Sequence, residues 1–200
     1  EFDTIYHEHF SYFSLLSIQK ILTSFKLEIF NVEELSIHGG SLRIFVKHEE
    51  NTIIKINKSV EKLLKKEIES GLSSISNYES FSERVKETKL KIWDFFISAK
   101  KDGKKIVGYG APAKGNTMLN YCGIGKEILE YTVDISPHKQ GMFLPGTHIP
   151  IKNPDMIKET KPDYVVILSW NFKDEIVEQM NYIREWGGKF VVLHPKIEIF

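Results

Sequence analysis

From residue 103 to the C-terminus, short apolar segments rich in Val, Ile and Tyr alternate with segments of helical character. A helix that joins two neighbouring parallel strands must cross over the sheet, and such crossovers are right-handed. The alternation therefore predicts an α/β fold with a parallel, Rossmann-like sheet. The predicted strands are 105–111, 128–135, 162–169 and 189–193, and the predicted helices are 113–122, 154–160 and 172–186.

The first 50 residues contain fewer elements. Apolar side chains at three- and four-residue spacing predict a helix at 14–26, with Ser14 as its N-cap. A strand is predicted at 27–32, and a second, half-buried strand follows the turn His38-Gly39-Gly40. A helix and two strands cannot close a core alone, so we expect them to be the end of a larger α/β sheet.

Residues 51–102 show helical spacing of apolar side chains with Lys and Glu on the other faces. The pattern is broken near Gly71 and predicts two helices, at 53–69 and 75–101, with a solvated, charged surface. We read this part as a helical connector. The expected domains are therefore 1–50, 51–102 and 103–200.

Charge and cysteine content exclude several classes of function. The chain has 27 basic and 27 acidic side chains, so it gives no general electrostatic reason to bind nucleic acid or an anionic membrane. Its single cysteine, Cys122, excludes an internal disulfide framework and a multi-cysteine zinc site. No apolar run approaches the ~20 residues that span a bilayer. These features predict a soluble, cytoplasmic protein, and the dense aromatic start after Glu1 predicts a fragment of a longer one.

A glycine-rich stretch follows the first predicted strand of the C-terminal part and opens a helix. In this setting, backbone N–H groups and the helix dipole bind phosphate. The glycines at 108, 110 and 115 have the spacing G-x-G-x4-G, which is neither the dinucleotide motif nor a P-loop. A phosphate-bearing ligand is favoured over NAD, and a tight turn that binds nothing is the alternative. The candidate contacts are Gly108, Gly110, Ala111, Lys114, Asn116 and Thr117.

Two further segments are expected at the same edge of the sheet. Asp134 ends the next strand, where a carboxylate commonly meets a ribose or sugar hydroxyl. Asp134 is also a residue type that favours turns, so the sequence leaves open whether it contacts a ligand or only shapes a turn. Trp170 and Asn171 follow a later strand and offer an aromatic ring and an amide for base stacking and hydrogen bonding.

The second candidate cluster is Tyr6-His7-Glu8-His9. Histidine titrates near neutrality, a carboxylate can orient its ring, and a phenol can donate to developing negative charge, so the residue types fit acid–base chemistry. A metal reading would pair His7 with His9, but the sequence offers no third ligand. A polar segment that only begins a helix is the remaining alternative.

At these segments the chain resembles the SAM-dependent C-methyltransferases of nucleotide-linked keto-deoxysugars. The resemblance covers nearly the whole chain in the right order and is weakest across the middle helices. It is carried by Ile5-Tyr6-His7-Glu8-His9-Phe10-Ser11-Tyr12-Phe13-Ser14, His38-Gly39-Gly40-Ser41-Leu42-Arg43, Gly108-Tyr109-Gly110-Ala111-Pro112-Ala113-Lys114-Gly115-Asn116-Thr117, Pro145-Gly146-Thr147, Ser169-Trp170-Asn171 and Arg184-Glu185-Trp186-Gly187-Gly188-Lys189-Phe190.

The resemblance implies three parts in the whole enzyme: an N-terminal zinc-binding region, a central class I methyltransferase domain that binds SAM, and a C-terminal Rossmann-like domain that helps hold the sugar nucleotide. This chain would begin late in the central domain. Zinc is then expected only in the missing N-terminal region, and the SAM site mostly upstream. We expect the chain to bind nucleotide without methylating alone.

The resemblance also implies roles for three residues in methylating the carbon beside the keto group of a (d)TDP-linked deoxysugar. His9 would be the base that removes the proton from that carbon, giving an enolate that attacks the SAM methyl. Glu8 would tune or orient His9, and Tyr6 would lie against the sugar or its oxyanion. Whether His7 or His9 is the base stays open.

Two other classes of function also stay open. One is a NAD(P)-dependent oxidoreductase domain that uses the loop at Gly108 together with Asp134. The other is a non-catalytic nucleotide-binding module. The sequence does not fix the oligomeric state, a monomer being compatible with it, nor the sugar, the carbon or the nucleotide base.

Overall fold

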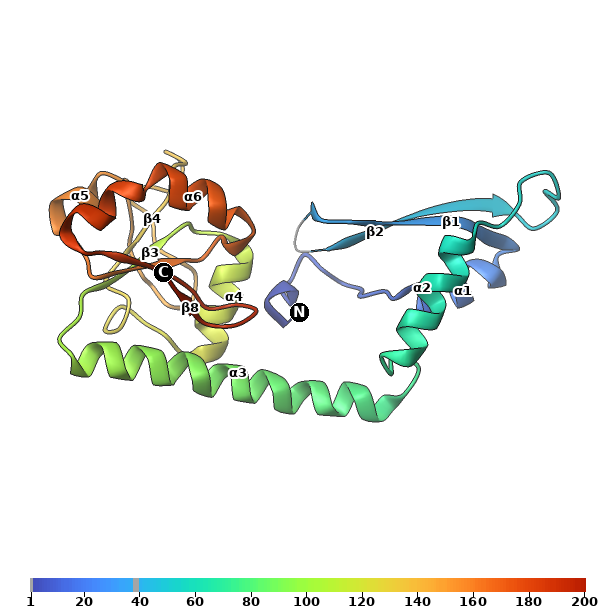
Figure 1. The fold of residues 1–200 in the computed structure, drawn as a ribbon, viewed down its shortest axis with the longest axis horizontal. Coiled ribbons are helices and arrows are strands. Elements are labelled where there is room, and N and C mark those ends of the chain that lie inside the picture. The colour runs from blue at the N-terminus through green and yellow to red at the C-terminus, as the bar shows by residue number, and fades with distance from the viewer. Residues whose placement is uncertain (1, 38–39) are drawn as a thin grey trace. The chain divides into compact units, whose positions relative to one another are not determined.

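The computed structural model describes residues 2–37 and 40–200, so the predicted turn at His38 and Gly39 lies outside the described residues. The chain forms two compact units (Figure 1). One, here called the sheet unit, combines residues 1–9 with 84–200, and the other, the hairpin unit, consists of residues 10–83. The long helix α3, Ile75–Lys101, begins in the hairpin unit and ends in the sheet unit.

The sheet unit contains a six-stranded sheet with the order β5-β4-β3-β6-β7-β8. All neighbouring pairs are parallel except β7 and β8, which are antiparallel. This mostly parallel sheet confirms the predicted α/β class and is compatible with a Rossmann-like fold. The strands are β3 Ile106–Tyr109, β4 Thr132–Val133, β5 Ile151–Lys152, β6 Tyr164–Ile167, β7 Lys189–Val192 and β8 Glu198–Ile199.

Two of these strands, β5 and β8, were not predicted. Each is two residues long, too short to show the apolar run by which a strand is recognised in sequence. The predicted strand 128–135 is also shorter in the structure, where only Thr132 and Val133 pair.

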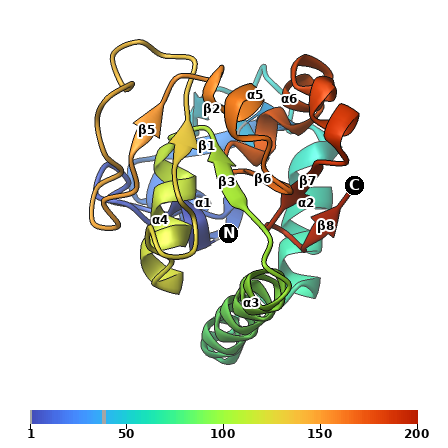
Figure 2. The ribbon, with the colours of Figure 1, turned by 90° about the vertical axis from the view of Figure 1, so that its left-hand side faces the viewer.

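Helices cover both faces of the sheet (Figure 2). Helix α4, Ala113–Cys122, has the predicted bounds, and α5, Met156–Thr160, begins two residues later than predicted. Because both faces are covered, the central strands read as apolar runs, and Val107, Val165 and Phe190 have no exposed surface.

The prediction of a single helix at 172–186 is wrong. The structure instead has a 3-10 helix η3, Trp170–Phe172, the α-helix α6, Lys173–Gln179, and a second 3-10 helix η4, Asn181–Trp186. In η4 the backbone tightens to bonds of the i→i+3 type, such as Gly187 N to Arg184 O, while the ring of Trp186 donates to Pro162 O.

Besides the start of α3, the hairpin unit contains α1, Leu15–Ser24, the antiparallel strands β1, Leu27–Leu35, and β2, Ser41–His48, and α2, Lys58–Glu69. Ser14 caps α1 as predicted. The helix ends at Ser24 and does not reach the predicted end at residue 26, because Lys26 has a positive φ of 56°, which is not a helical conformation. Residues 53–57 are not helical, since Asn57 caps α2 by accepting from Ser59 N. The core contains Leu15, Ile29, Val32, Val60 and Leu63.

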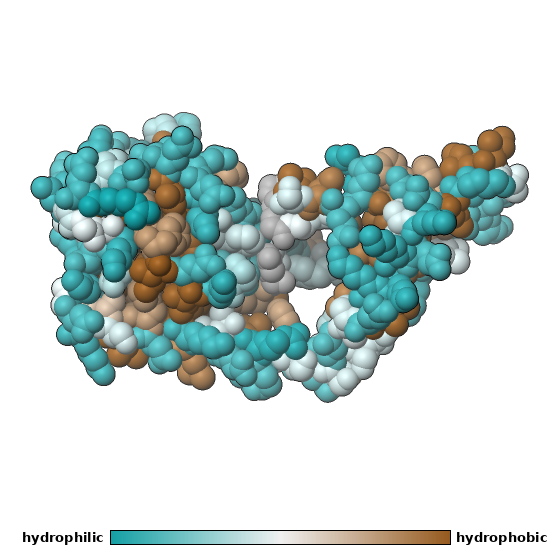
Figure 3. Space-filling model, in the orientation of Figure 1, coloured by the Kyte–Doolittle hydropathy of each residue, from teal (hydrophilic) through white to brown (hydrophobic). Residues whose placement is uncertain are grey.

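Apolar side chains remain exposed on the hairpin unit, and Figure 3 shows brown patches among its hydrophilic surface. Phe10 is 94% exposed, and Phe13 and Ile53 are also exposed. Among residues 2–37 and 40–200, none of the helices combines the length and the apolar character needed to cross a membrane.

Candidate functional site

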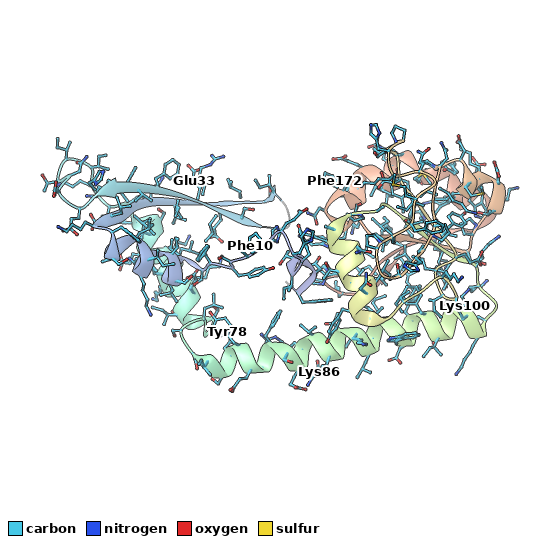
Figure 4. The ribbon with its side chains drawn as sticks, turned by 180° about the vertical axis from the view of Figure 1, so that it is seen from behind. Phe10, Glu33, Tyr78, Lys86, Lys100 and Phe172 are labelled. Carbon is cyan, nitrogen blue, oxygen red and sulfur yellow. The ribbon has the colours of Figure 1, made fainter. Side chains whose placement is uncertain are left out.

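A pocket of about 440 Å³ lies at the carboxyl edge of the parallel sheet, where open α/β folds bind their ligands. Tyr109 ends β3, Asp134 follows β4, and Ser169 follows β6, so three strands deliver their ends to it. The lining is Tyr109, Gly110, Pro112, Asp134, Ile135, Lys139, Ser169, Phe172, Glu175, Ile176 and Gln179. Phe172 is labelled in Figure 4.

Each of the three predicted glycines is required by close packing. A Cβ at Gly108 would meet the Thr132 Oγ1 at 2.7 Å, and one at Gly115 would meet the Leu168 Cβ at 2.8 Å. Gly110 has a positive φ of 94° and lies against the Ser169 hydroxyl. The turn geometry alone therefore accounts for the glycine spacing. The loop also leads into α4, whose N-cap, Pro112, makes no side-chain hydrogen bond to the first-turn N–H groups.

Asp134 holds this loop in place. It is 8% exposed, and its carboxylate accepts hydrogen bonds from Ala111 N at 2.8 Å and Ser136 N at 2.9 Å. Lys139 Nζ lies 3.2 Å from the same carboxylate and also donates to the Ala111 carbonyl at 3.1 Å. These bonds favour the turn reading of Asp134, while a contact to a sugar hydroxyl stays a prediction. Burial, and secondarily the charge of Asp134, raises the pKa of the pocket residue Tyr109.

The other predicted binding residues lie elsewhere. Lys114 Nζ lies 4.7 Å from the centroid of the Trp170 ring, and the Thr117 hydroxyl donates to Ala113 O within α4. The side-chain oxygen of Asn116 is buried, and Asn171 is exposed. Of the predicted binding residues, Gly110 and Asp134 line the pocket.

Sequence reasoning missed the contribution of α6 to the pocket. Glu175, Ile176 and Gln179 line it at three- and four-residue spacing, so they lie on one face of α6. The spacing can be seen in the sequence. The sequence does not show how the helix is rotated about its axis relative to the sheet, and this rotation decides which face lines the pocket.

The first residues of the chain pack against the sheet unit, and Figures 1 and 2 both show their 3-10 helix η1, Phe2–Thr4, beside α4. The ring of Phe2 lies 5.3 Å from that of Tyr121 and 5.9 Å from that of His194. Trp170 Nε1 donates to Asp3 Oδ2 at 2.9 Å. These contacts attach the residues just before the segment Tyr6-His7-Glu8-His9 to the part of the sheet unit formed by residues 84–200.

Within that segment, His9 Nδ1 lies 2.8 Å from the Thr4 carbonyl oxygen, and its ring centroid lies 4.2 Å from that of Tyr6. A carbonyl can only accept, so Nδ1 carries a hydrogen in this contact and the neutral ring has its basic lone pair on Nε2. His7, Glu8 and His9 are exposed. Among residues 2–37 and 40–200, no three His, Cys, Asp or Glu side chains are grouped to hold a metal ion.

Comparison with known proteins identifies a family and a relative. Residues 36–195 match the model of a family described as C-methyltransferase C-terminal domain. The C-methyltransferase NovU of Streptomyces niveus is 35% identical over 201 residues, an alignment that covers 98% of this chain and 46% of that protein. The chain therefore spans about half the length of the curated relative that it matches.

Proposed function

The chain belongs to the C-methyltransferase family through its C-terminal domain, and from this premise we propose that it supplies the sugar-nucleotide pocket and the catalytic base of an enzyme that methylates carbon. One observation carries the proposal. The pocket at the carboxyl edge and the acid–base segment Tyr6-His7-Glu8-His9 belong to the same folded unit, although they are far apart in sequence.

The proposed reaction begins with removal of a proton from a carbon beside a keto group. Nε2 of His9 takes this proton, because Nδ1 is engaged with the Thr4 carbonyl. The negative charge then moves to the keto oxygen, and the Tyr6 hydroxyl is suited to donate a hydrogen bond to it. Glu8, the residue before His9 in sequence, is assigned the role of orienting the imidazole. The carbanion character left at the carbon is what a methyl donor captures.

The proposed substrate is a keto-deoxysugar linked to a nucleoside diphosphate such as dTDP. A volume of about 440 Å³ is within the usual range of small-molecule sites, so the pocket accommodates part of such a molecule. Lys139 offers positive charge for the diphosphate, the lining residue Pro112 is the N-cap of α4, and Phe172 offers a ring for stacking. The three expected domains, 1–50, 51–102 and 103–200, remain part of this proposal, with the last holding the sugar nucleotide.

SAM is the methyl donor in this proposal, but the described residues do not by themselves fit it. In the hairpin unit β1 and β2 are antiparallel neighbours, and β2 leads to α2 through residues 49–57, a stretch without glycine. The strand, glycine loop and helix that would cradle such a cofactor do not occur in the described part of this unit. We therefore assign no SAM contact to this chain, and any zinc site to the remainder of the protein.

The test uses the whole protein with SAM and a panel of nucleotide-linked keto-deoxysugars, with methyl transfer followed by mass spectrometry. His9→Ala should lower kcat by roughly 10²–10⁴, the usual contribution of a general base. His7→Ala is the matched control, since His7 is an exposed imidazole of the same segment, and it should stay within about threefold of the unaltered enzyme. An unaltered rate in His9→Ala would show that the base is another residue.

The ligand is tested separately by calorimetry with dTDP, a dTDP-sugar and NAD. We expect heat of binding with the two dTDP compounds and none with NAD. Binding of NAD in place of dTDP would favour the oxidoreductase alternative and contradict the proposal.

A further inference from the structure

Trp170 adjoins the pocket lining in sequence and contacts the stretch of chain that leads to His9. In sequence it is flanked by Ser169 and close to Phe172, and both of these line the pocket. Trp170 does not itself line the pocket, but it begins the short helix η3, Trp170–Phe172, whose N-cap is Ser169 and whose last residue is Phe172. Its indole, by contrast, donates to Asp3 Oδ2 at 2.9 Å, across 167 positions of sequence.

Asp3 depends on this hydrogen bond. Its side chain is only 1% exposed, and a carboxylate removed from water is costly unless its oxygens are satisfied. Within the described part of the chain, Oδ2 accepts from Trp170, whereas Oδ1 is buried with no hydrogen-bond partner. The indole N–H is therefore a bond whose loss would leave this buried charge poorly compensated.

Asp3 is joined directly to the acceptor of His9. The next residue, Thr4, offers the carbonyl that lies 2.8 Å from His9 Nδ1, and both Asp3 and Thr4 belong to η1. A displacement of Asp3 would therefore move the atom that orients the imidazole. The connection runs along the chain from the lining residue Ser169 to Trp170, by a hydrogen bond from Trp170 to Asp3, and through the next residue, Thr4, to His9.

We propose that Trp170 is a positioning residue that couples occupation of the pocket to alignment of the base. This inference rests on the proposed function, since it takes His9 as the base. A ligand that contacts Ser169 or Phe172 fixes η3, and the Trp170–Asp3 hydrogen bond then fixes the turn that presents His9. Proton transfer requires the base to be placed within hydrogen-bond reach of the carbon-bound proton, so this alignment acts on the chemical step.

The competing role for Trp170 is stacking on the nucleotide base. The two roles differ in what they change. A stacking residue contributes to binding of the sugar nucleotide, and the phenyl ring of a Trp170→Phe variant would still provide a face. A positioning residue acts through its N–H, which that variant removes. The split between KM and kcat therefore separates them.

The experiment compares Trp170→Phe with Trp186→Phe in the whole protein. Trp186 is a matched control because it also donates an indole hydrogen bond within the sheet unit, to Pro162 O at 3.0 Å. We expect Trp170→Phe to lower kcat about tenfold or more, as for loss of a hydrogen bond to a charged group, with KM for the sugar nucleotide changed less than about twofold. Trp186→Phe should leave both constants near those of the unaltered enzyme.

Hydrogen exchange gives a readout that does not need turnover. In Trp170→Phe, amides of residues 4–9 should exchange about tenfold faster while those of α4 stay unchanged. Asp3→Asn keeps a side-chain oxygen that can accept from the indole, so it should retain more of the protection and of kcat than Asp3→Ala.

Each outcome decides one question. A raised KM with unchanged kcat in Trp170→Phe would overturn the inference and make Trp170 a ligand contact. Unchanged kcat together with unchanged exchange in residues 4–9 would overturn it as well. Absence of methyl transfer in the unaltered whole protein would count against the proposed function alone, and the exchange data would still decide whether Trp170 positions the segment.

Discussion

The carboxylate of Glu67 accepts a hydrogen bond of 2.7 Å from the backbone N–H of Leu15, a residue 52 positions earlier in the chain. Its second oxygen accepts from Leu16 N at 2.8 Å. The first N–H groups of a helix have no partner within the helix, and here a side chain of α2 supplies two acceptors to the start of α1. Negative charge at this end also interacts favourably with the helix dipole.

Replacing Glu67 should therefore destabilise the hairpin unit. Glu67 is 7% exposed, and Glu67→Ala would leave two N–H groups at the start of α1 without these acceptors. We expect a loss of about 1–3 kcal/mol in the free energy of unfolding, measured by urea titration. Glu69→Ala in the same helix is the control, because Glu69 is exposed and should cost less than about 0.5 kcal/mol. Equal effects of the two changes would refute the capping role.

The turn after β3 should tolerate no side chain at Gly110. Its φ of 94° is strained for an L-residue, and an added Cβ would collide with the Ser169 hydroxyl. Gly123 also has a positive φ, 73°, but has open space around its Cα. Gly123→Ala should lower the free energy of unfolding by about 1 kcal/mol through backbone strain alone. Gly110→Ala should lower it by a further amount of about 1–3 kcal/mol, because the collision adds to the strain. Thermal unfolding of the two variants measures the difference, and similar melting temperatures would contradict it.

The Cys122 thiol should be unreactive in the folded protein. Burial raises its pKa to about 11, although the charge of Lys89 acts in the opposite direction. At neutral pH the thiolate is then almost absent, and we expect a disulfide reagent to modify Cys122 only upon unfolding. Rapid modification under native conditions would contradict this.

The same pKa predicts how stability depends on alkaline pH. The unfolded thiol has a pKa near ~8.5, so between this value and about 11 the folded state binds more protons than the unfolded state. The contribution of Cys122 is complete below ~8.5 and is lost as pH rises through about 11. Other groups titrate in this range, so the measurement is the difference in urea stability between the unaltered protein and Cys122→Ala. That difference should shrink as pH rises.

Lys139 should contribute to anion binding in the pocket. It lines the pocket and is held by Asp134 and the Ala111 carbonyl. Lys139→Met keeps the aliphatic stem, and we expect it to weaken binding of dTDP about tenfold at low salt and less at high salt, because exposed charges are screened. Lys126→Met, at an exposed site outside the pocket lining, is the control. The affinity for dTDP is measured by calorimetry at two salt concentrations. An affinity that does not depend on salt would exclude a charge contact between Lys139 and dTDP.

The helices and strands with a strong local signal could be predicted from sequence. Helix α4 has the predicted bounds because an apolar strand, a glycine turn and an αL glycine, Gly123, mark both of its ends. β5 and β8 could not be predicted, because two residues give no periodicity and each strand is fixed by its neighbour in the sheet. The second half of the predicted helix 172–186 became 3-10 because tertiary contacts such as Trp186 to Pro162 override helix propensity.

The site was predictable only in its local part. The strand–glycine–helix pattern located the carboxyl edge, whereas the acid–base chemistry indicated by the residue types at 6–9 stays a prediction. The hydrogen bond between Trp170 and Asp3 joins residues 167 positions apart, and no local pattern records such a partner. The sequence analysis assigned no role to Asp3, which the structure buries.

The sheet unit is assembled from two separate stretches of chain, and this limits where the protein can be divided. A gene fragment beginning at Arg84 would encode every strand from β3 to β8 but would omit Phe2 and Asp3. Its product would lack the Phe2 ring that packs against Tyr121, and the indole N–H of Trp170 would lose its acceptor. In the same way, a single proteolytic nick on either side of the hairpin unit leaves that unit covalently tethered, so two cleavages are required to release it.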